Sequence, residues 1–359
     1  MKTRESNLEL LRIISIIMII FYHFLYHTNI LLNSTNTLNI VSNIIAALLI
    51  IHVNLFILIS GYYGYKAKFK ISKLLSINNA MWFYTIIFTI IGLVFLNVSF
   101  TKLDLFKNFL PIDFNGYWFV TTYLLLYLLM PILNVFINNS NKKNHLIVLV
   151  FLFIAFSIIP TLTHGEVFNV SRGYSLYHFI FIYLLGAYLG KYKISFKTHY
   201  LLFTYIICAT INIFNHYVSP LLVENTNSLI NYIGKSLGDS CLTYANPIVI
   251  IQAVAFFLLF TKLKIKNNII NTIAGTVLGI YLIHDNPIFR EQYSSISFSN
   301  SLITILIGLL FTIVVFISCM IIELLRKQVF KFIYDLKISK SLRPKYTKYF
   351  NKIEKYVNE

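Results

Sequence analysis

The sequence predicts an all-α polytopic membrane helix bundle with about ten transmembrane helices and both termini in the cytoplasm. Two features of composition indicate the fold class. Of the 359 residues, 57% are hydrophobic and only 12% are charged, and the mean hydropathy is +0.73. A soluble domain of this length carries about 25% charged residues. A third feature, the uneven placement of Lys and Arg between the apolar segments, indicates the orientation.

The apolar segments follow one another along the chain with short connections. A helix that crosses the roughly 30 Å hydrocarbon core needs about 20 predominantly apolar residues. We predict spans at residues 8–30, 40–60, 79–97, 117–137, 146–162, 175–190, 200–218, 244–261, 269–288 and 301–322. The first segment is long, contains Arg12 and lacks a small-residue cleavage site, so we expect a retained anchor. We therefore predict one transmembrane domain, residues 1–322, followed by a basic amphipathic cytoplasmic tail, residues 323–359.

The basic residues orient these spans. With the N-terminus inside, 24 of the 30 Lys and Arg residues lie in inside segments, five lie outside and Arg12 lies in the membrane. The positive-inside rule then places both termini in the cytoplasm. The net charge of +17 is accounted for by this orientation and by anionic lipid at the inner leaflet, so we expect no nucleic-acid partner. The three cysteines lie in separate segments without metal spacing and predict no disulfide framework.

Arg12 and His23 share one stripe of the first predicted helix. They are eleven residues apart, and eleven steps of about 100° return to within roughly 20° of the start. Along the axis they are about 16 Å apart, half of a bilayer core. Ionisable groups at this depth are costly and usually functional. His23 is the candidate general base, and Arg12 could bind a phosphate or a carboxylate on a neighbouring helix. A structural histidine and a snorkelling arginine are the simpler alternatives.

A basic run follows the second predicted span in SGYYGYKAKFKISKLLS. Gly61 and Gly64 are expected to break the helix. The closely spaced cations that follow could grip the phosphates of a nucleotide-type cofactor, or could serve only to set the topology. These candidate cofactor-binding residues are Lys66, Lys68, Lys70 and Lys73.

Candidate acceptor-binding residues lie toward the outer side: Trp118, Arg172, His284 and Asp285. Asp285 could orient an imidazole, but neighbours on a helix point about 100° apart, so it need not serve His284. Trp118 could equally be an interfacial anchor, and Arg172 an ordinary loop charge. His52 and Asn54, with Thr121, Thr122 and Tyr123, are further polar candidates inside the spans. No HExxH, GxSxG or GxxxxGK[ST] motif occurs, and no metal site is predicted.

Arg12 and His23, with ten residues between them, resemble the signature of the acyltransferase-3 family of bacterial integral membrane O-acyltransferases. Further segments resemble that family in the same order: SGYYGYKAKFKISKLL, GYWFVTTYLLLYLLMPILN, GYSLYHFIFIYLLGAYLGKY and GIYLIHDNP. The resemblance extends over nearly the whole chain. It implies a bacterial cell membrane enzyme that transfers an acyl group, usually acetyl from cytoplasmic acetyl-CoA, to hydroxyls of surface or lipid-linked glycans.

By position, His23 resembles the family's essential histidine and Arg12 its partner basic residue. The lysine run resembles a segment implicated in acyl-CoA handling, where many members carry arginines; lysine lacks the guanidinium fork. We expect the phosphates of acetyl-CoA near Arg12 and this run, with the pantetheine arm extending to His23. His23 would then deprotonate an acceptor hydroxyl or carry the acetyl group. A polysaccharide biosynthesis complex or a second copy of the chain are expected partners.

Two other functions fit the same residues. In a carrier or flippase for a glycan or small metabolite, His23 and Arg12 would be substrate or proton-relay groups; the lack of an internal repeat counts against this alternative. The protein could instead be a scaffold without catalytic activity in a polysaccharide synthase complex. Its loss would then remove the polymer itself rather than the acetyl groups on the polymer.

Overall fold

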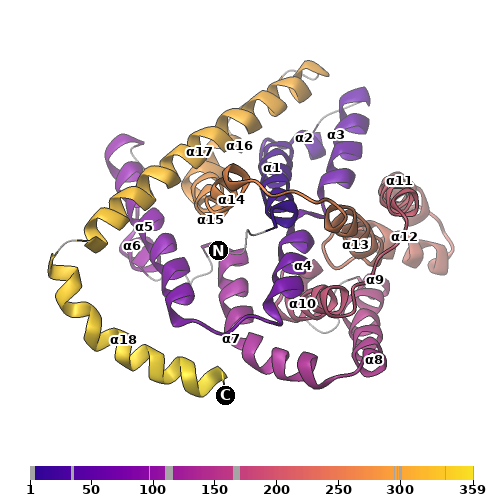
Figure 1. Cartoon of the computed structure of the whole chain (residues 1–359). Helices are drawn as coiled ribbons and strands as arrows, with labels where there is room; N and C mark the ends of the chain where they lie inside the picture. Colours follow the sequence, from indigo (N-terminus) through magenta and orange to yellow (C-terminus); the bar gives the residue numbers. More distant parts are fainter. Residues whose placement is uncertain are drawn as a thin grey trace.

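The computed structural model describes residues 5–33, 36–96, 98–109, 116–164, 170–294, 296, 298, 301–335 and 337–358. In these ranges all regular elements are helices, and no strand occurs (Figure 1). The predicted all-α class is therefore confirmed.

Seven of the described helical segments are long and apolar enough to cross a membrane, which makes this a multi-pass membrane protein. Each one overlaps a predicted span. They are α1 (Asn7–His27), α3 (Asn36–Leu49) continuing into α4 (His52–Gly64), α5 (Ile71–Phe95), α7 (Trp118–Asn139), α8 (Lys142–Phe153) continuing through the π-helical turn η1 (Ile154–Ile158) into α9 (Ile159–Leu162), α11 (Thr198–Val223) and α17 (Ile303–Asp335).

Three shorter apolar helical segments overlap the remaining predicted spans, and because they have only 10–17 residues the total of ten spans stays a prediction. They are α10 (Leu176–Lys191), α13 (Pro247–Thr261), and α14 (Asn268–Ala274) followed by α15 (Val277–His284). The connections and the tail form the other described helices: α2 (Ile30–Asn33), α6 (Lys102–Phe109), η3 (Ser171–Gly173), α12 (Ser228–Ser240), α16 (Pro287–Ser294) and α18 (Lys337–Asn358).

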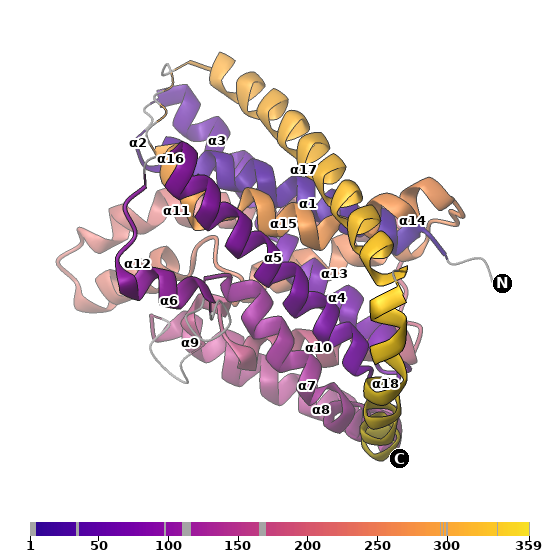
Figure 2. The same ribbon diagram turned by 90° about the vertical axis from the view of Figure 1, so that its left-hand side faces the viewer.

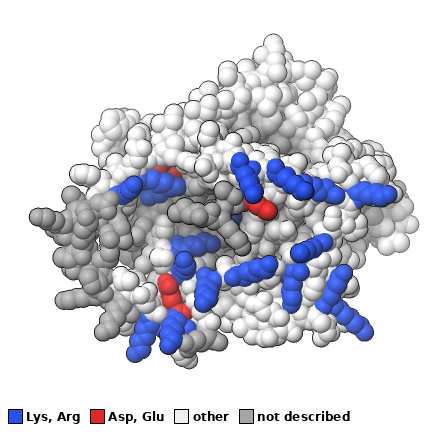
Figure 3. Space-filling model, in the orientation of Figure 1, with Lys and Arg blue, Asp and Glu red and all other residues white. Residues whose placement is uncertain are grey.

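Basic residues gather on one face of the bundle. The start of α1 and the end of α18 lie at one end, whereas α2, α12 and α16 lie toward the other (Figure 2). Lys and Arg gather on the face that Figure 3 shows, where α1 starts and α18 ends, and we call it the basic face. Ser6 fixes the start of α1 there, because its N–H donates to the Ile265 carbonyl at 2.8 Å and its hydroxyl to the Asn267 carbonyl at 3.2 Å. That the basic face is the cytoplasmic one stays a prediction.

The α4 and α10 helices touch backbone to backbone through glycines. A Cβ atom at Gly61 would lie 2.0 Å from the Tyr183 carbonyl oxygen, and one at Gly186 would lie 2.4 Å from the Leu58 carbonyl oxygen. The prediction that Gly61 breaks the helix is wrong, since α4 continues through it to Gly64. Gly61 instead permits the close approach of a second helix.

Two helices extend beyond their predicted edges at the basic face. The α5 helix begins at Ile71 rather than at residue 79, so Lys73 stands in its first turn. The α17 helix continues past residue 322 to Asp335. Glu323 is 2% exposed within it, and its Oε2 accepts from the Tyr84 hydroxyl at 2.6 Å and from Arg326 Nε at 2.7 Å. This network satisfies a charge that would otherwise be buried without a partner.

Candidate functional site

Two cavities meet inside the bundle. The entrance cavity, of about 1040 Å³, lies at the basic face between the Gly64–Lys73 segment, α7 and the end of α18. The inner cavity, of about 350 Å³, lies among α1, α4, α7 and the α14–α15 segment. Four side chains line both cavities, and we call them the neck: Arg12, Ser60, Lys73 and Tyr123. The entrance cavity and the inner cavity therefore adjoin at these four side chains.

The four predicted cofactor-binding lysines all line the entrance cavity: Lys66, Lys68, Lys70 and Lys73. The side chain of Lys73 lies over the Tyr127 ring, with Nζ 4.7 Å from the ring centroid. Lys73 Nζ also lies 5.8 Å from the ring centroid of Tyr123, which is a neck residue, so the ammonium group stands at the neck. The structure thus gathers the run at a cavity mouth, and binding of a cofactor there stays a prediction.

Arg12 stands in the neck. It lies on the same face of α1 as His23, nearer the start of the helix. Its Nη1 lies 3.0 Å from both Glu9 carboxylate oxygens, so its partner carboxylate comes from its own helix rather than from a neighbouring one. Glu9 is buried, whereas the Arg12 side chain keeps 27% of its surface exposed. The guanidinium has further N–H donors that Glu9 does not use, and these can bind an anion at the neck.

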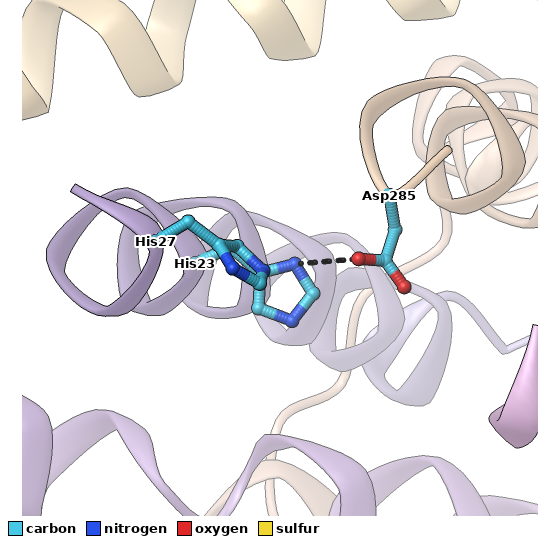
Figure 4. A group of neighbouring side chains, drawn as sticks. All are labelled: His23, His27 and Asp285. Atoms are coloured by element: carbon cyan, nitrogen blue, oxygen red, sulfur yellow. Dashed lines mark ion pairs between the residues drawn. The ribbon is translucent and has the colours of Figure 1, made fainter. Parts of the chain in front are cut away.

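His23 lies at the far end of the same helix face and lines the inner cavity. Its Nδ1 is 3.4 Å from Oδ1 of Asp285, the residue that ends α15 (Figure 4). The same oxygen is 3.6 Å from Arg290 Nε of α16. A turn at Asn286 and Pro287 joins α15 to α16 and sets Asp285 beside Arg290; Asn286 Oδ1 accepts the N–H of Ile288 at 3.1 Å. The structure therefore pairs Asp285 with His23, a partner far away in sequence.

The charge of Asp285 bears on which nitrogen of His23 is available, although Nδ1 makes no hydrogen bond among the described residues. A carboxylate beside Nδ1 favours the tautomer that carries its proton there. The lone pair then remains on Nε2, which is the form of imidazole that accepts a proton. If His23 accepted a proton, the nearby Asp285 carboxylate would stabilise the imidazolium, and Arg290 would balance the carboxylate while the ring is neutral.

His284 lies next to His23, with their ring centroids 5.3 Å apart. Its Nδ1 donates to the Ile280 carbonyl at 2.8 Å, which leaves Nε2 unprotonated in the neutral ring. Nε2 is buried and has no hydrogen-bond partner among the described residues. A second free imidazole nitrogen therefore stands beside the candidate base, and its predicted role in acceptor binding stays a prediction.

The same region contains a group that could hold a metal. One ligand atom each from His23, His27 and Asp285 lies within 4.8 Å of the others. Two imidazoles and a carboxylate are typical ligands of zinc. However, Arg290 already places a positive charge 3.6 Å from Asp285, and this charge opposes a cation there. That no metal is needed remains our prediction.

Trp118 and Arg172 differ in their surroundings. Trp118 lines the inner cavity at the end of α7 away from the basic face, and its ring centroid lies 4.4 Å from that of Tyr174 and 6.1 Å from that of Tyr244. Arg172 lines neither cavity. Its side chain is 59% exposed, and Nη2 lies 3.7 Å from Asp239. Among the outer candidates, Trp118 is thus the one placed at the inner cavity.

Sequence reasoning named His52 but missed its neighbours Phe56 and Ser60 in the wall of the inner cavity. His52, Phe56 and Ser60 follow a four-residue spacing on one face of α4 and all line the inner cavity. Both ring nitrogens of His52 are buried without a partner among the described residues, and its ring lies between those of Tyr22 and Tyr244. His52 and Ser60 are polar residues eight apart in a largely apolar helix, and this spacing is the signal that could have found Ser60.

These features define a multi-pass membrane protein with a histidine–carboxylate pair beside an inner cavity, and this cavity shares four side chains with a second cavity at the basic face. The model of a family described as "Acyltransferase domain", Acyl_transf_3, matches residues 5–324. The chain therefore belongs to the acyltransferase-3 family and is a membrane acyltransferase, as its motifs indicated. No curated protein and no solved structure matches it.

Proposed function

We propose that the protein is an O-acetyltransferase of the bacterial cell membrane, which moves an acetyl group from cytoplasmic acetyl-CoA to a hydroxyl of a cell-surface or lipid-linked polysaccharide. The observation that carries the proposal is the neck, because the same four side chains line both the basic entrance cavity and the cavity that contains His23. A donor with a charged head and a long arm fits this arrangement better than a compact solute does.

The donor would lie along this path. Its phosphates contact Arg12 and the lysines of the entrance cavity, which supply the positive charge that anionic oxygens require. The pantetheine arm passes the neck toward His23, over the separation of about 16 Å that the helix geometry gives. The inner cavity is largely lined by apolar side chains, which suits an uncharged arm.

At His23 the reaction is acyl transfer from a thioester to a hydroxyl. Nε2 of His23 takes the hydroxyl proton as the acceptor oxygen attacks the thioester carbonyl, so that a C–O bond forms. The C–S bond then breaks, and the imidazolium returns its proton to the leaving CoA thiolate. The Asp285 carboxylate, with Oδ1 3.4 Å from Nδ1, stabilises the imidazolium. A transient acetyl group on His23 is the alternative route through the same residue.

The acceptor would enter from the side opposite the basic face. Trp118 supplies an aromatic surface at that end of the inner cavity, and His284 and Asp285 lie beside His23. This placement lets a glycan outside the membrane reach a donor that binds from the cytoplasm.

The test uses purified full-length protein in liposomes, supplied with acetyl-CoA and with surface glycans that mild alkali has stripped of esters. Release of CoA thiol and appearance of glycan acetyl ester are measured together. His23→Gln should lose both by at least about 100-fold. His199→Ala, which removes an exposed histidine of α11 that lines neither cavity, should leave both unchanged. Glycan uptake without CoA release would instead support the carrier.

A further inference from the structure

The end of α18 makes specific contacts with the basic run, although the sequence predicts only that the tail lies on the lipid surface. The Phe69 N–H donates to Asn358 Oδ1 at 2.8 Å, and Asn358 Nδ2 donates back to the Phe69 carbonyl at 3.1 Å. The Ile71 N–H donates to Glu354 Oε1 at 2.7 Å. Three hydrogen bonds thus join two segments that are more than 280 residues apart in sequence.

These contacts complete the support of a short stretch of backbone. Lys70 lies between the two anchored residues. Its N–H donates to the Tyr127 hydroxyl oxygen at 3.0 Å, and that hydroxyl donates to the Lys70 carbonyl at 3.1 Å. Each N–H from Phe69 to Ile71 therefore has a side-chain acceptor from α7 or α18. A backbone held at three successive residues has little freedom to move, so it fixes where the side chain of Lys70 begins.

Glu354 has a second effect because of where it binds. Ile71 is the first residue of α5, and Lys70 at the N-cap provides no side-chain cap. A carboxylate that accepts an N–H at this position replaces the missing cap and interacts favourably with the helix dipole. Glu354 thus stabilises the turn of α5 that carries Lys73, which is a neck residue.

The same part of α18 belongs to the cavity wall, since Val357 and Asn358 line the entrance cavity beside Lys66, Lys68 and Lys70. The opposite face of the helix points away. Lys352 and Tyr356 each lie about 200° from Glu354 around the axis, and Tyr356 is 84% exposed. One face of α18 therefore contacts the protein, and the other is available to lipid or water.

We propose that the end of α18 forms part of the donor-binding site, with Glu354 and Asn358 as positioning residues that hold the Phe69–Ile71 backbone so that Lys70 and Lys73 face the phosphates of a bound acyl-CoA. This inference rests on the proposed function, and it adds that the tail forms one wall of the donor site. It assigns the opposite face of α18, with Lys352 and Tyr356, no part in donor binding.

The experiment measures the Kd of radiolabelled acetyl-CoA and the steady-state kinetics of full-length protein in nanodiscs. Glu354→Ala and Asn358→Ala should each raise the Kd and KM for acetyl-CoA about three- to tenfold, the effect of losing a helix cap or its equivalent, with kcat unchanged. Glu354→Gln keeps an oxygen that can accept the Ile71 N–H, so its Kd and KM for acetyl-CoA should lie close to those of the wild type. Lys352→Gln and Tyr356→Ala are the matched controls and should bind acetyl-CoA as the wild type does.

Each outcome decides one claim. An unchanged Kd in both alanine variants, with normal binding by the wild type, would overturn the role of α18 and leave the proposed function intact. Equal losses in the opposite-face controls would show that the tail acts as a membrane anchor instead. Failure of the wild type to bind acetyl-CoA would refute the proposed function itself. Binding is expressed per folded protein, as measured by size-exclusion chromatography, so that unfolding does not imitate a loss of affinity.

Discussion

Replacing Asp285 with Asn removes the charge that lies 3.4 Å from His23 Nδ1 while keeping the size of the side chain. Two unit charges at this distance attract by about 5 kcal/mol at an effective dielectric constant of about 20. The imidazole carries about half of a positive charge when the proton is half transferred, so about 2 to 3 kcal/mol of transition-state stabilisation is lost. This loss corresponds to roughly a 30- to 160-fold lower kcat.

The assay is release of CoA thiol in liposomes at saturating acetyl-CoA, with KM determined separately. Asp285→Asn should lower kcat and leave the KM for acetyl-CoA within about twofold, because Asp285 acts on His23 and not on the donor phosphates. Asp239→Asn is the matched control. Asp239 also pairs with a histidine and an arginine, with His164 Nδ1 at 3.3 Å and Arg172 Nη2 at 3.7 Å, but it lines neither cavity. Equal effects of the two variants, or a wild-type kcat in Asp285→Asn, would refute the reasoning.

Three other predictions concern the neck, the helix crossing and the metal question. Arg12→Gln should raise the KM for acetyl-CoA about tenfold or more through loss of a charge-assisted contact, and an unchanged KM would remove Arg12 from the donor site. Gly61→Ala should lower the melting temperature in detergent, because its Cβ would lie 2.0 Å from the Tyr183 carbonyl oxygen. Overpacking of this kind typically costs about 1–3 kcal/mol. Gly92→Ala is the control and should have a smaller effect, because the nearest atoms to its Cβ are side-chain atoms at 3.1 Å or more. EDTA should not reduce activity, and restoration of a chelated enzyme by Zn²⁺ would show instead that His23, His27 and Asp285 bind metal.

The sequence predicted those parts of the site that lie on one helix. Arg12 and His23 share a stripe of α1 because helix geometry alone relates residues eleven apart, and the structure places them at the neck and in the inner cavity. The lysine run was predicted as a candidate phosphate-binding segment for a similar reason, since its closely spaced cations directly follow a predicted helix end, and the structure places it at the entrance cavity. Local geometry and charge were enough for these residues.

Partners from distant segments could not be predicted. Asp285 lies next to His284 in the sequence, yet it faces His23 because the turn before α16 directs it across the bundle. The contact between Glu354 and Ile71 joins positions 283 apart, and no periodicity relates them. Gly61 suggested a helix break by its conformational freedom, whereas its actual use depends on a second helix that approaches it.

The most direct test of the account is NMR of surface polysaccharide from cells that express the wild type, cells that express His23→Ala, and cells without the gene. The account predicts O-acetyl signals with the wild type and their loss in both other strains, while the yield of polysaccharide stays unchanged. Full O-acetylation with His23→Ala at normal protein levels would contradict it.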